Sequence, residues 1–175
     1  EEQPLVYLSI TSMGGIALIV TKQGVKSVKL PKIDTNILFS KVWPIPSFKD
    51  ELTRSEIMTE SLGGYLSTYY FATTPSWGLE DNLLDLWKSI LDAFTHWLWD
   101  VIMGDLFFKL KEYCNTNSVV IIPTGLLSAL PLHAAWIEDQ NRPTGRWYAL
   151  DEINISYAPS AHALWNARLA VERPC

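Results

Sequence analysis

Histidine is the residue type most often used as a general acid or base, and this sequence has three: His96, His133 and His162. His133 stands out because it is the only ionisable group in the run VVIIPTGLLSALPLHAAW, which extends from Val119 to Trp136. It is the candidate base if the chain is a hydrolase in its own right. Structural roles are the simpler interpretation of all three: His96 lies in an amphipathic helical pattern, and His162 in the first turn of a predicted helix.

Two cysteines, Cys114 and Cys175, are the only candidate thiol nucleophiles. Cys114 lies in KEYCNTN at the predicted end of a helix, where no basic cluster would lower its pKa. Cys175 is the final residue, so no segment after it holds a site. We therefore interpret both as inert thiols, and a Cys–His pair is not expected.

No other motif of the sequence predicts an active site. His-x-x-x-His and Cys-x-x-Cys are absent, so a metal site is not expected. Phosphate and dinucleotide loops are absent too, and Ser160 lies in APSAH instead of Gly-x-Ser-x-Gly. The residues alone predict no catalytic, no cofactor-binding and no metal-ligating residue, and no cofactor.

The composition limits the possible partners. The chain has 175 residues, 48% of them apolar, and a net charge of −5. An acidic chain without a basic run is a poor candidate for binding nucleic acid or an anionic membrane. Its eight tryptophans need deep burial or a partner surface. We expect a protein partner.

The cellular context is predicted from the cysteines and the termini. Two widely spaced cysteines indicate reduced thiols and a cytoplasmic protein. Glu1 and Glu2 do not resemble the start of a signal peptide, and the missing initiator methionine suggests a segment of a longer protein. Two stretches without charge, Pro4–Thr21 and Ser118–Ile137, contain glycine, proline and serine breakers, so strands and turns are expected there instead of membrane spans.

The amino-terminal residues predict a three-stranded antiparallel meander. Apolar runs at Leu5–Ile10, Ile16–Val20 and Val25–Leu30 are separated by glycine-containing turns. Residues 31–50 contain three prolines and are predicted to form a loop. A helix is expected over Phe48–Leu62, and the aromatic segment Tyr65–Ala72 fits either a helix or a strand.

The strongest periodicity predicts a long amphipathic helix over residues 79–103. Its apolar positions recur every three or four residues: Leu79, Leu83, Leu86, Trp87, Ile90, Leu91, Phe94, Trp97, Leu98, Val101 and Ile102. Gly104 is expected to end this helix. Phe107–Tyr113 is expected to add a further helical turn.

Two short apolar runs, Ser118–Ile122 and Ile153–Tyr157, are typical of strands buried on both faces. Ser160 is a suitable N-cap for a helix over Ala161–Val171. We therefore predict an α/β or α+β fold that forms one domain or a partial domain over 1–175. Its parts are a meander (1–31), a mainly helical region (47–113) and a strand–turn–strand–helix region (118–175).

The carboxyl-terminal third resembles the beginning of the CHAT family, caspase-like domains often attached to tetratricopeptide repeats. The matching residues are Ile122-Pro123, Leu127, Leu130–Ala135, Leu150-Asp151-Glu152 and Ile155–Ala161. The long helix and the early meander fit the family pattern as well. The match covers residues 118–165 well and residues 1–110 loosely, and its specificity lies in the order of the motifs.

The resemblance implies a caspase-like sheet and cysteine-peptidase chemistry, with a histidine base and a cysteine nucleophile. Both catalytic segments of the family follow the SYAPSA motif, and no His-Gly dipeptide occurs in this chain. His133 matches a scaffold position of the family and not its base. The expected function is an amino-terminal scaffold or regulatory portion of such a peptidase, without its dyad. The alternatives are a non-enzymatic protein-interaction module and a pseudoprotease.

Overall fold

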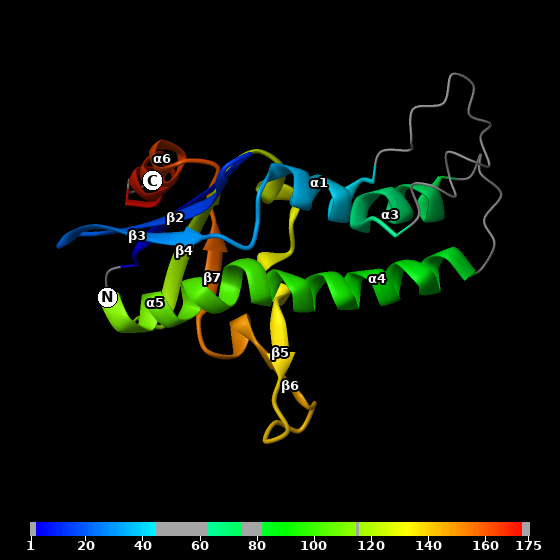
Figure 1. Cartoon of the computed structure of the whole chain (residues 1–175). Coiled ribbons are helices and arrows are strands. Elements are labelled where there is room, and N and C mark those ends of the chain that lie inside the picture. Colours follow the sequence, from blue (N-terminus) through cyan, green and yellow to red (C-terminus); the bar gives the residue numbers. More distant parts are fainter. Residues whose placement is uncertain (1–2, 45–62, 75–81, 115, 173–175) are drawn as a thin grey trace. The chain divides into compact units, whose positions relative to one another are not determined.

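A computed structural model describes residues 3–44, 63–74, 82–114 and 116–172. The chain divides into two compact units, one formed by Glu1–Asp34 with Leu98–Cys175 and the other by Thr35–Trp97. The first unit contains a five-stranded sheet and the second is helical in its described residues (Figure 1). The predicted mixed α/β class is therefore confirmed.

The sheet of the first unit begins with the predicted meander. Strands β1 (Leu5–Thr11), β2 (Gly14–Thr21) and β3 (Gly24–Leu30) pair antiparallel through two tight turns. Thr11 and Thr21 begin these turns in the same way, because each hydroxyl accepts the N–H two residues later and donates to the glycine carbonyl three residues later. Gly14 and Gly24 have φ angles of 123° and 129°, which side chains disfavour, so glycine is needed at both positions.

Two parallel strands complete the sheet in the order β3-β2-β1-β4-β7. Strand β4 (Ser118–Pro123) lies parallel to β1, and β7 (Asn154–Tyr157) lies parallel to β4. The four residues Val119 to Ile122 are buried on both faces, as predicted for this run. Parallel pairing brings the carboxyl ends of β1, β4 and β7 to one edge of the sheet.

Strand β7 differs from the prediction because its side chains are not buried on both faces. It is the last strand of the described sheet, and three of its four residues are exposed. The N–H groups of successive residues in a strand point to opposite sides. Asn154 donates its N–H to the carbonyl of Asn117, which directly precedes β4, and Ala158 donates to the carbonyl of Ile121 within β4. The N–H groups of Ile155 and Tyr157 therefore point to the open side of β7.

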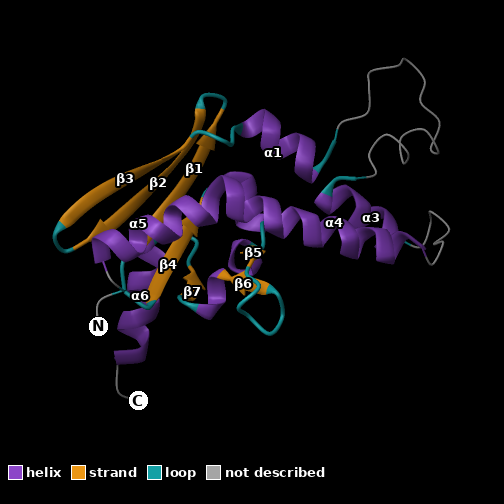
Figure 2. Cartoon of the chain, turned by 60° about the horizontal axis from the view of Figure 1, so that its bottom comes forward, coloured by secondary structure: helices purple, strands orange, loops and turns teal. Residues whose placement is uncertain are grey.

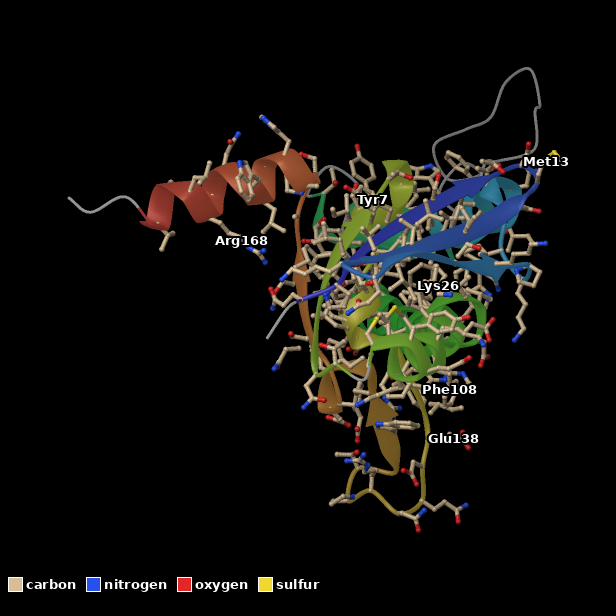
Figure 3. All side chains as sticks on the ribbon, turned by 90° about the vertical axis from the view of Figure 1, so that its left-hand side faces the viewer. Tyr7, Met13, Lys26, Phe108, Glu138 and Arg168 are labelled. Atoms are coloured by element: carbon tan, nitrogen blue, oxygen red, sulfur yellow. The ribbon has the colours of Figure 1, made fainter. Side chains whose placement is uncertain are left out.

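The two faces of the sheet are covered by different helices. The buried face, with Val6, Leu8, Ile19 and Leu30 at its centre, packs against helix α5 (Gly104–Cys114). The opposite face carries Leu5, Tyr7, Val120 and Ile122, which pack with Ala161 and Leu164 of α6 (Ala161–Glu172). Figure 3 shows Tyr7 and Lys26 on opposite faces of the sheet.

The predicted long helix is confirmed, but it does not end at Gly104. Helix α4 (Asn82–Leu98) leads into a π-helical segment, η2 (Trp99–Met103), and then into α5. Gly104 has helical dihedral angles and donates its N–H to the carbonyl of Trp99, so helical hydrogen bonding continues through it. Packing explains why the glycine does not act as a breaker, since Trp99, Ile102 and Leu106 are all buried around it.

The second unit contains α1 (Thr35–Val42), α3 (Tyr65–Thr73) and α4 up to Trp97. Helix α1 corrects the prediction of a loop over residues 31–50, because Leu38 and Val42 become buried one turn apart. Helix α3 decides the ambiguous aromatic segment in favour of a helix, and its Tyr65 ring stacks on Phe94 at 4.8 Å. The helix predicted over Phe48–Leu62 lies outside the described residues.

A small hairpin between β4 and β7 is not predicted by the sequence. Strands β5 (Trp136–Glu138) and β6 (Arg146–Tyr148) form a separate two-stranded sheet, visible in Figure 2. The guanidinium of Arg146 lies 3.9 Å from the ring centroid of Trp136. Trp147 contacts the rings of Trp99 and Phe107, so the hairpin is attached to η2 and α5.

Candidate functional site

The loops that follow β4 and β7 meet at the carboxyl edge of the parallel strands. After Pro123 the chain forms a 3₁₀ turn, η3 (Gly125–Ala129), and Thr124 donates its N–H to the carbonyl of Leu8 at 2.9 Å. Leu127 and Leu130 are buried beneath this turn. Ligands of α/β sheets commonly bind at this edge, outside the carboxyl ends of the strands. It is therefore the first place to look for a site.

His133 is fixed at this edge by Tyr157, the last residue of β7. It lies in a second 3₁₀ turn, η4 (Leu132–Ala134), and its backbone N–H donates to the Tyr157 hydroxyl at 3.0 Å. The same hydroxyl lies 3.1 Å from Nδ1 of His133, and the two rings meet nearly edge to face. The direction of the hydrogen bond between the hydroxyl and Nδ1 depends on the tautomer of the imidazole.

Tyr157 is 43% exposed, and the partial burial of its side chain raises its pKa above the ordinary value of 10.0, while the hydrogen bond from the His133 backbone opposes this rise. The tyrosine is therefore a neutral hydroxyl at physiological pH. It can donate to His133 and accept from it at the same time. The pair connects the loop after β4 to the end of β7, and we call it the Tyr157–His133 contact.

A cavity of about 170 Å³ opens beside this contact, lined by Pro123, Ser128, Tyr157, Ala158 and Pro159. Ser128 is its only aliphatic hydroxyl, and that hydroxyl donates to the carbonyl of Gly125 at 2.7 Å. A serine nucleophile needs the opposite arrangement, with its proton directed at a base. The described residues at this edge thus shape a small cleft and do not supply an activated nucleophile.

The other residues considered from the sequence belong to helices α4 and α6 or to the cap of α6. His96 belongs to α4 in the second unit. His162 lies in the first turn of α6, with Nδ1 3.4 Å from the side-chain amide of Asn166. The prediction of Ser160 as an N-cap is confirmed, because its hydroxyl accepts the N–H of Ala163.

Cys114 ends α5, and burial raises the pKa of its thiol above the ordinary value of 9.0. A thiol with a raised pKa is a poor nucleophile at neutral pH. Cys175 lies outside the described residues. Within the described part of the chain, no three His, Cys, Asp or Glu side chains lie together as metal ligands do.

Sequence reasoning missed Tyr157 as the partner of His133. The available signal was its place in ISYAPSA, directly at the end of a predicted strand. The pairing itself depends on the parallel register of β4 and β7, which brings together residues 24 positions apart.

Comparisons with known proteins identify no relative: no family model, no curated protein and no solved structure matches this chain. Among the helices in the described ranges, none combines the length and the apolar character that crossing a membrane requires.

Proposed function

We propose that this chain is the amino-terminal scaffold portion of a caspase-like cysteine peptidase of the CHAT type. In this role it holds a partner segment that carries the histidine and cysteine of the dyad, in the same polypeptide or in another. The observation that carries the proposal is the place where its motif segments meet. LPLHAA and ISYAPSA, which give the resemblance, contact each other through Tyr157 and His133 at the carboxyl edge of the parallel strands.

The open side of β7 supports the same function. Parallel strands are normally covered and paired on both sides. In the described sheet β7 pairs with β4 alone, and the N–H groups of Ile155 and Tyr157 point outward. A strand of the partner segment that pairs there parallel to β7 would place its own carboxyl end beside the cavity at Pro123 and Tyr157.

The roles of the chain and of its partner follow from the side chains that the described residues supply. This chain supplies the buried sheet and a cleft wall, while the partner supplies base and nucleophile. The Tyr157–His133 contact positions the wall and takes no proton from a substrate in this scheme.

The test combines this chain with a candidate segment, from the same reading frame or a neighbouring gene, that contains a His-Gly dipeptide and a downstream cysteine. A cysteine-directed acyloxymethyl ketone probe is expected to label the partner cysteine in the complex and to leave this chain alone unlabelled. Ile155→Pro removes an outward N–H from the edge strand and is expected to abolish labelling, while Ile155→Val retains it. Labelling that persists with Ile155→Pro would contradict pairing at β7.

The interaction module or pseudoprotease is the alternative, favoured by the absence of an activated nucleophile among the described residues of the carboxyl edge. It predicts a complex that depends on Ile155 in the same way but is never labelled by the probe.

A further inference from the structure

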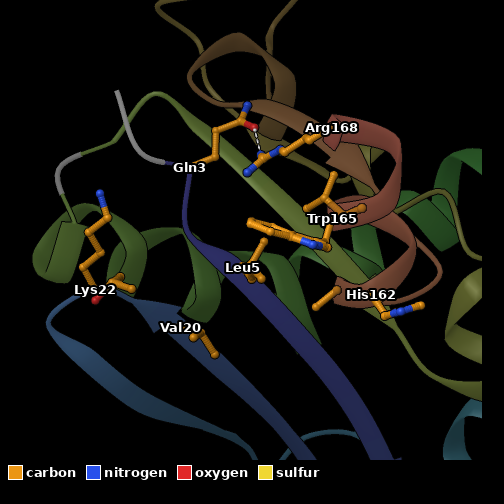
Figure 4. A pocket seen from close by; sticks show the side chains of 10 residues that line it. Gln3, Leu5, Val20, Lys22, His162, Trp165 and Arg168 are labelled. Carbon is orange, nitrogen blue, oxygen red and sulfur yellow. Dashed lines mark hydrogen bonds between the residues drawn. The ribbon is translucent and has the colours of Figure 1, made fainter. Parts of the chain in front are cut away.

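A second cavity, of about 520 Å³, lies away from β7, between α6 and strands β1 and β2 (Figure 4). Its lining comes from three elements and from the residues that flank them: Gln3, Leu5, Val20, Thr21, Lys22, Ala161, His162, Leu164, Trp165 and Arg168. Leu5, Val20 and Leu164 supply apolar lining. The Trp165 side chain extends from α6 toward Leu5 of β1. We call this feature the α6 groove.

The apolar surface continues beyond the α6 groove along the same sheet face. Val20 pairs with Leu5 on one side and with Val25 on the other, which places the three side chains in one row. Val25 is 60% exposed, and Ile16, on the same face of β2, is 38% exposed. Helix α6 contacts β1 and β4, so the β2 and β3 half of this face lacks a covering helix among the described residues.

Helix α6 adds exposed side chains of the types that dominate protein interfaces. Trp165 is 61% exposed, and Leu169 is exposed one turn further along. Arg168 also faces the groove, and its Nη2 donates to the side-chain carbonyl of Gln3 at 3.2 Å. A guanidinium has five N–H donors, so this one bond to a neutral amide leaves capacity for a carboxylate. Tryptophan and arginine are the residues most enriched at energetic hot spots.

The charge of the α6 groove is opposite to that of the whole chain. Among the described residues that line it, Lys22 and Arg168 carry a formal positive charge and none is an Asp or a Glu. The chain itself carries a net charge of −5. A cationic groove in an acidic protein favours an anionic occupant through local electrostatic complementarity.

We infer that the α6 groove and the adjoining β2–β3 face bind an amphipathic helix of a protein partner, apolar on one side with Asp or Glu beside the apolar stripe. A helix is the element that covers sheet faces in α/β folds, and the row from Leu5 to Val25 extends the apolar surface past the cavity. Its apolar side chains cover Val20, Val25 and Trp165, and its carboxylates meet Arg168. This goes beyond the proposed function, because it concerns a face of the sheet and not the β7 edge.

The test uses two synthetic helical peptides of about 18 residues, long enough to form helix. Both carry leucines at i, i+3, i+4 and i+7 spacing; one has glutamates beside the stripe and the other has lysines at the same positions. Isothermal titration is expected to show binding of the glutamate peptide, and binding of the lysine peptide at least about tenfold weaker. Equal binding of the two peptides, or no binding of either, would overturn the inference.

Substitutions test whether the glutamate peptide binds in the α6 groove. Trp165→Ala and Arg168→Glu are each expected to weaken the binding of the glutamate peptide at least about tenfold. Val171→Ala is the matched control, since Val171 lies on the same helix, is 86% exposed and does not line the groove. Trp165 is also exposed, so its loss is expected to leave the fold intact, and circular dichroism checks this. Binding that is insensitive to Trp165→Ala contradicts the assignment.

Two further measurements distinguish a partner helix from other occupants of the α6 groove. Dodecanoate that binds in a Trp165-dependent manner while neither peptide binds would assign the groove to a small apolar anion instead. Self-association that Trp165→Ala abolishes in light scattering would assign it to a second copy of the chain. Ile155→Pro is expected to leave peptide binding unchanged, so this inference and the proposed function fail independently.

Discussion

At the residue scale, His133 acts on this structure through its hydrogen bonds. Its N–H and its Nδ1 both meet the hydroxyl of Tyr157, at 3.0 and 3.1 Å. Two contacts to one hydroxyl fix the orientation of the imidazole, whichever tautomer it adopts. Its role in the described chain is therefore to fasten the loop after β4 to the end of β7.

Removal of this hydroxyl gives the first prediction. Tyr157→Phe keeps the ring but deprives the His133 N–H and Nδ1 of their partner, which costs about 1 kcal/mol of unfolding free energy. Urea denaturation monitors the change. Tyr7→Phe is the control, because the Tyr7 hydroxyl makes no hydrogen bond to any described residue. Equal stability of wild type and Tyr157→Phe would show that water replaces the contact without loss.

The thiol of Cys114 gives a second prediction. Burial raises its pKa above 9.0, so its thiolate fraction at neutral pH is smaller than that of a free thiol. In a Cys175→Ser background, the rate of alkylation by iodoacetamide is expected to rise with pH and to reach half its maximum above pH 9.0. N-acetylcysteine serves as the reference. A midpoint below that of the reference would indicate an activated thiol and would reopen the Cys–His interpretation.

The sequence identifies candidate side chains, but it does not show which distant residue each of them contacts. The cap at Ser160 is predictable because its partner Ala163 is three residues away. The partner of His133 is 24 residues away, and neither residue type nor spacing indicates it. Only the register of the parallel strands brings the two together.

At the element scale, the local turns are predictable and the position of an element within the sheet is not. Gly14 and Gly24 mark both hairpins because the turns themselves require a positive φ. The exposure of β7 depends on which strand lies beside it, and the sequence of β7 does not contain that information. The same limit applies to Gly104, where packing around Trp99 keeps the helix continuous despite a low helix propensity.

Hydrogen exchange along β7 is the third prediction. The N–H groups of Asn154 and Ala158 are bonded toward β4, and Ser156 shares their side by alternation. Ile155 and Tyr157 point to the open side. Amide exchange measured by NMR is therefore expected to alternate, fast at Ile155 and Tyr157 and slow at Ser156 and Ala158. Similar protection of all four amides would mean that the open side of β7 is already paired in the chain alone.

At the scale of the whole molecule, the described sheet of the first unit has an edge strand at each end, the antiparallel β3 and the parallel β7. One face of this sheet packs against α5, whereas the side of β7 away from β4 and the part of the opposite face beside α6 are uncovered in the described chain. Apolar surface and unpaired backbone groups left in water contribute nothing to folding free energy. Covering them with a partner therefore adds stability that the chain alone lacks.

This reasoning gives the fourth prediction, for the chain combined with a segment that carries the dyad. A partner that binds only the folded chain stabilises it by mass action, by about 2.7 kcal/mol at a free concentration one hundred times its Kd. Urea denaturation of this chain is expected to show that increase. Ile155→Pro should unfold like wild type when alone, because the N–H that it removes is directed to the open side, but it should lose the increment. An increment that survives in Ile155→Pro would place the stabilising contact elsewhere, and Trp165→Ala in the same titration would show whether the α6 groove provides it.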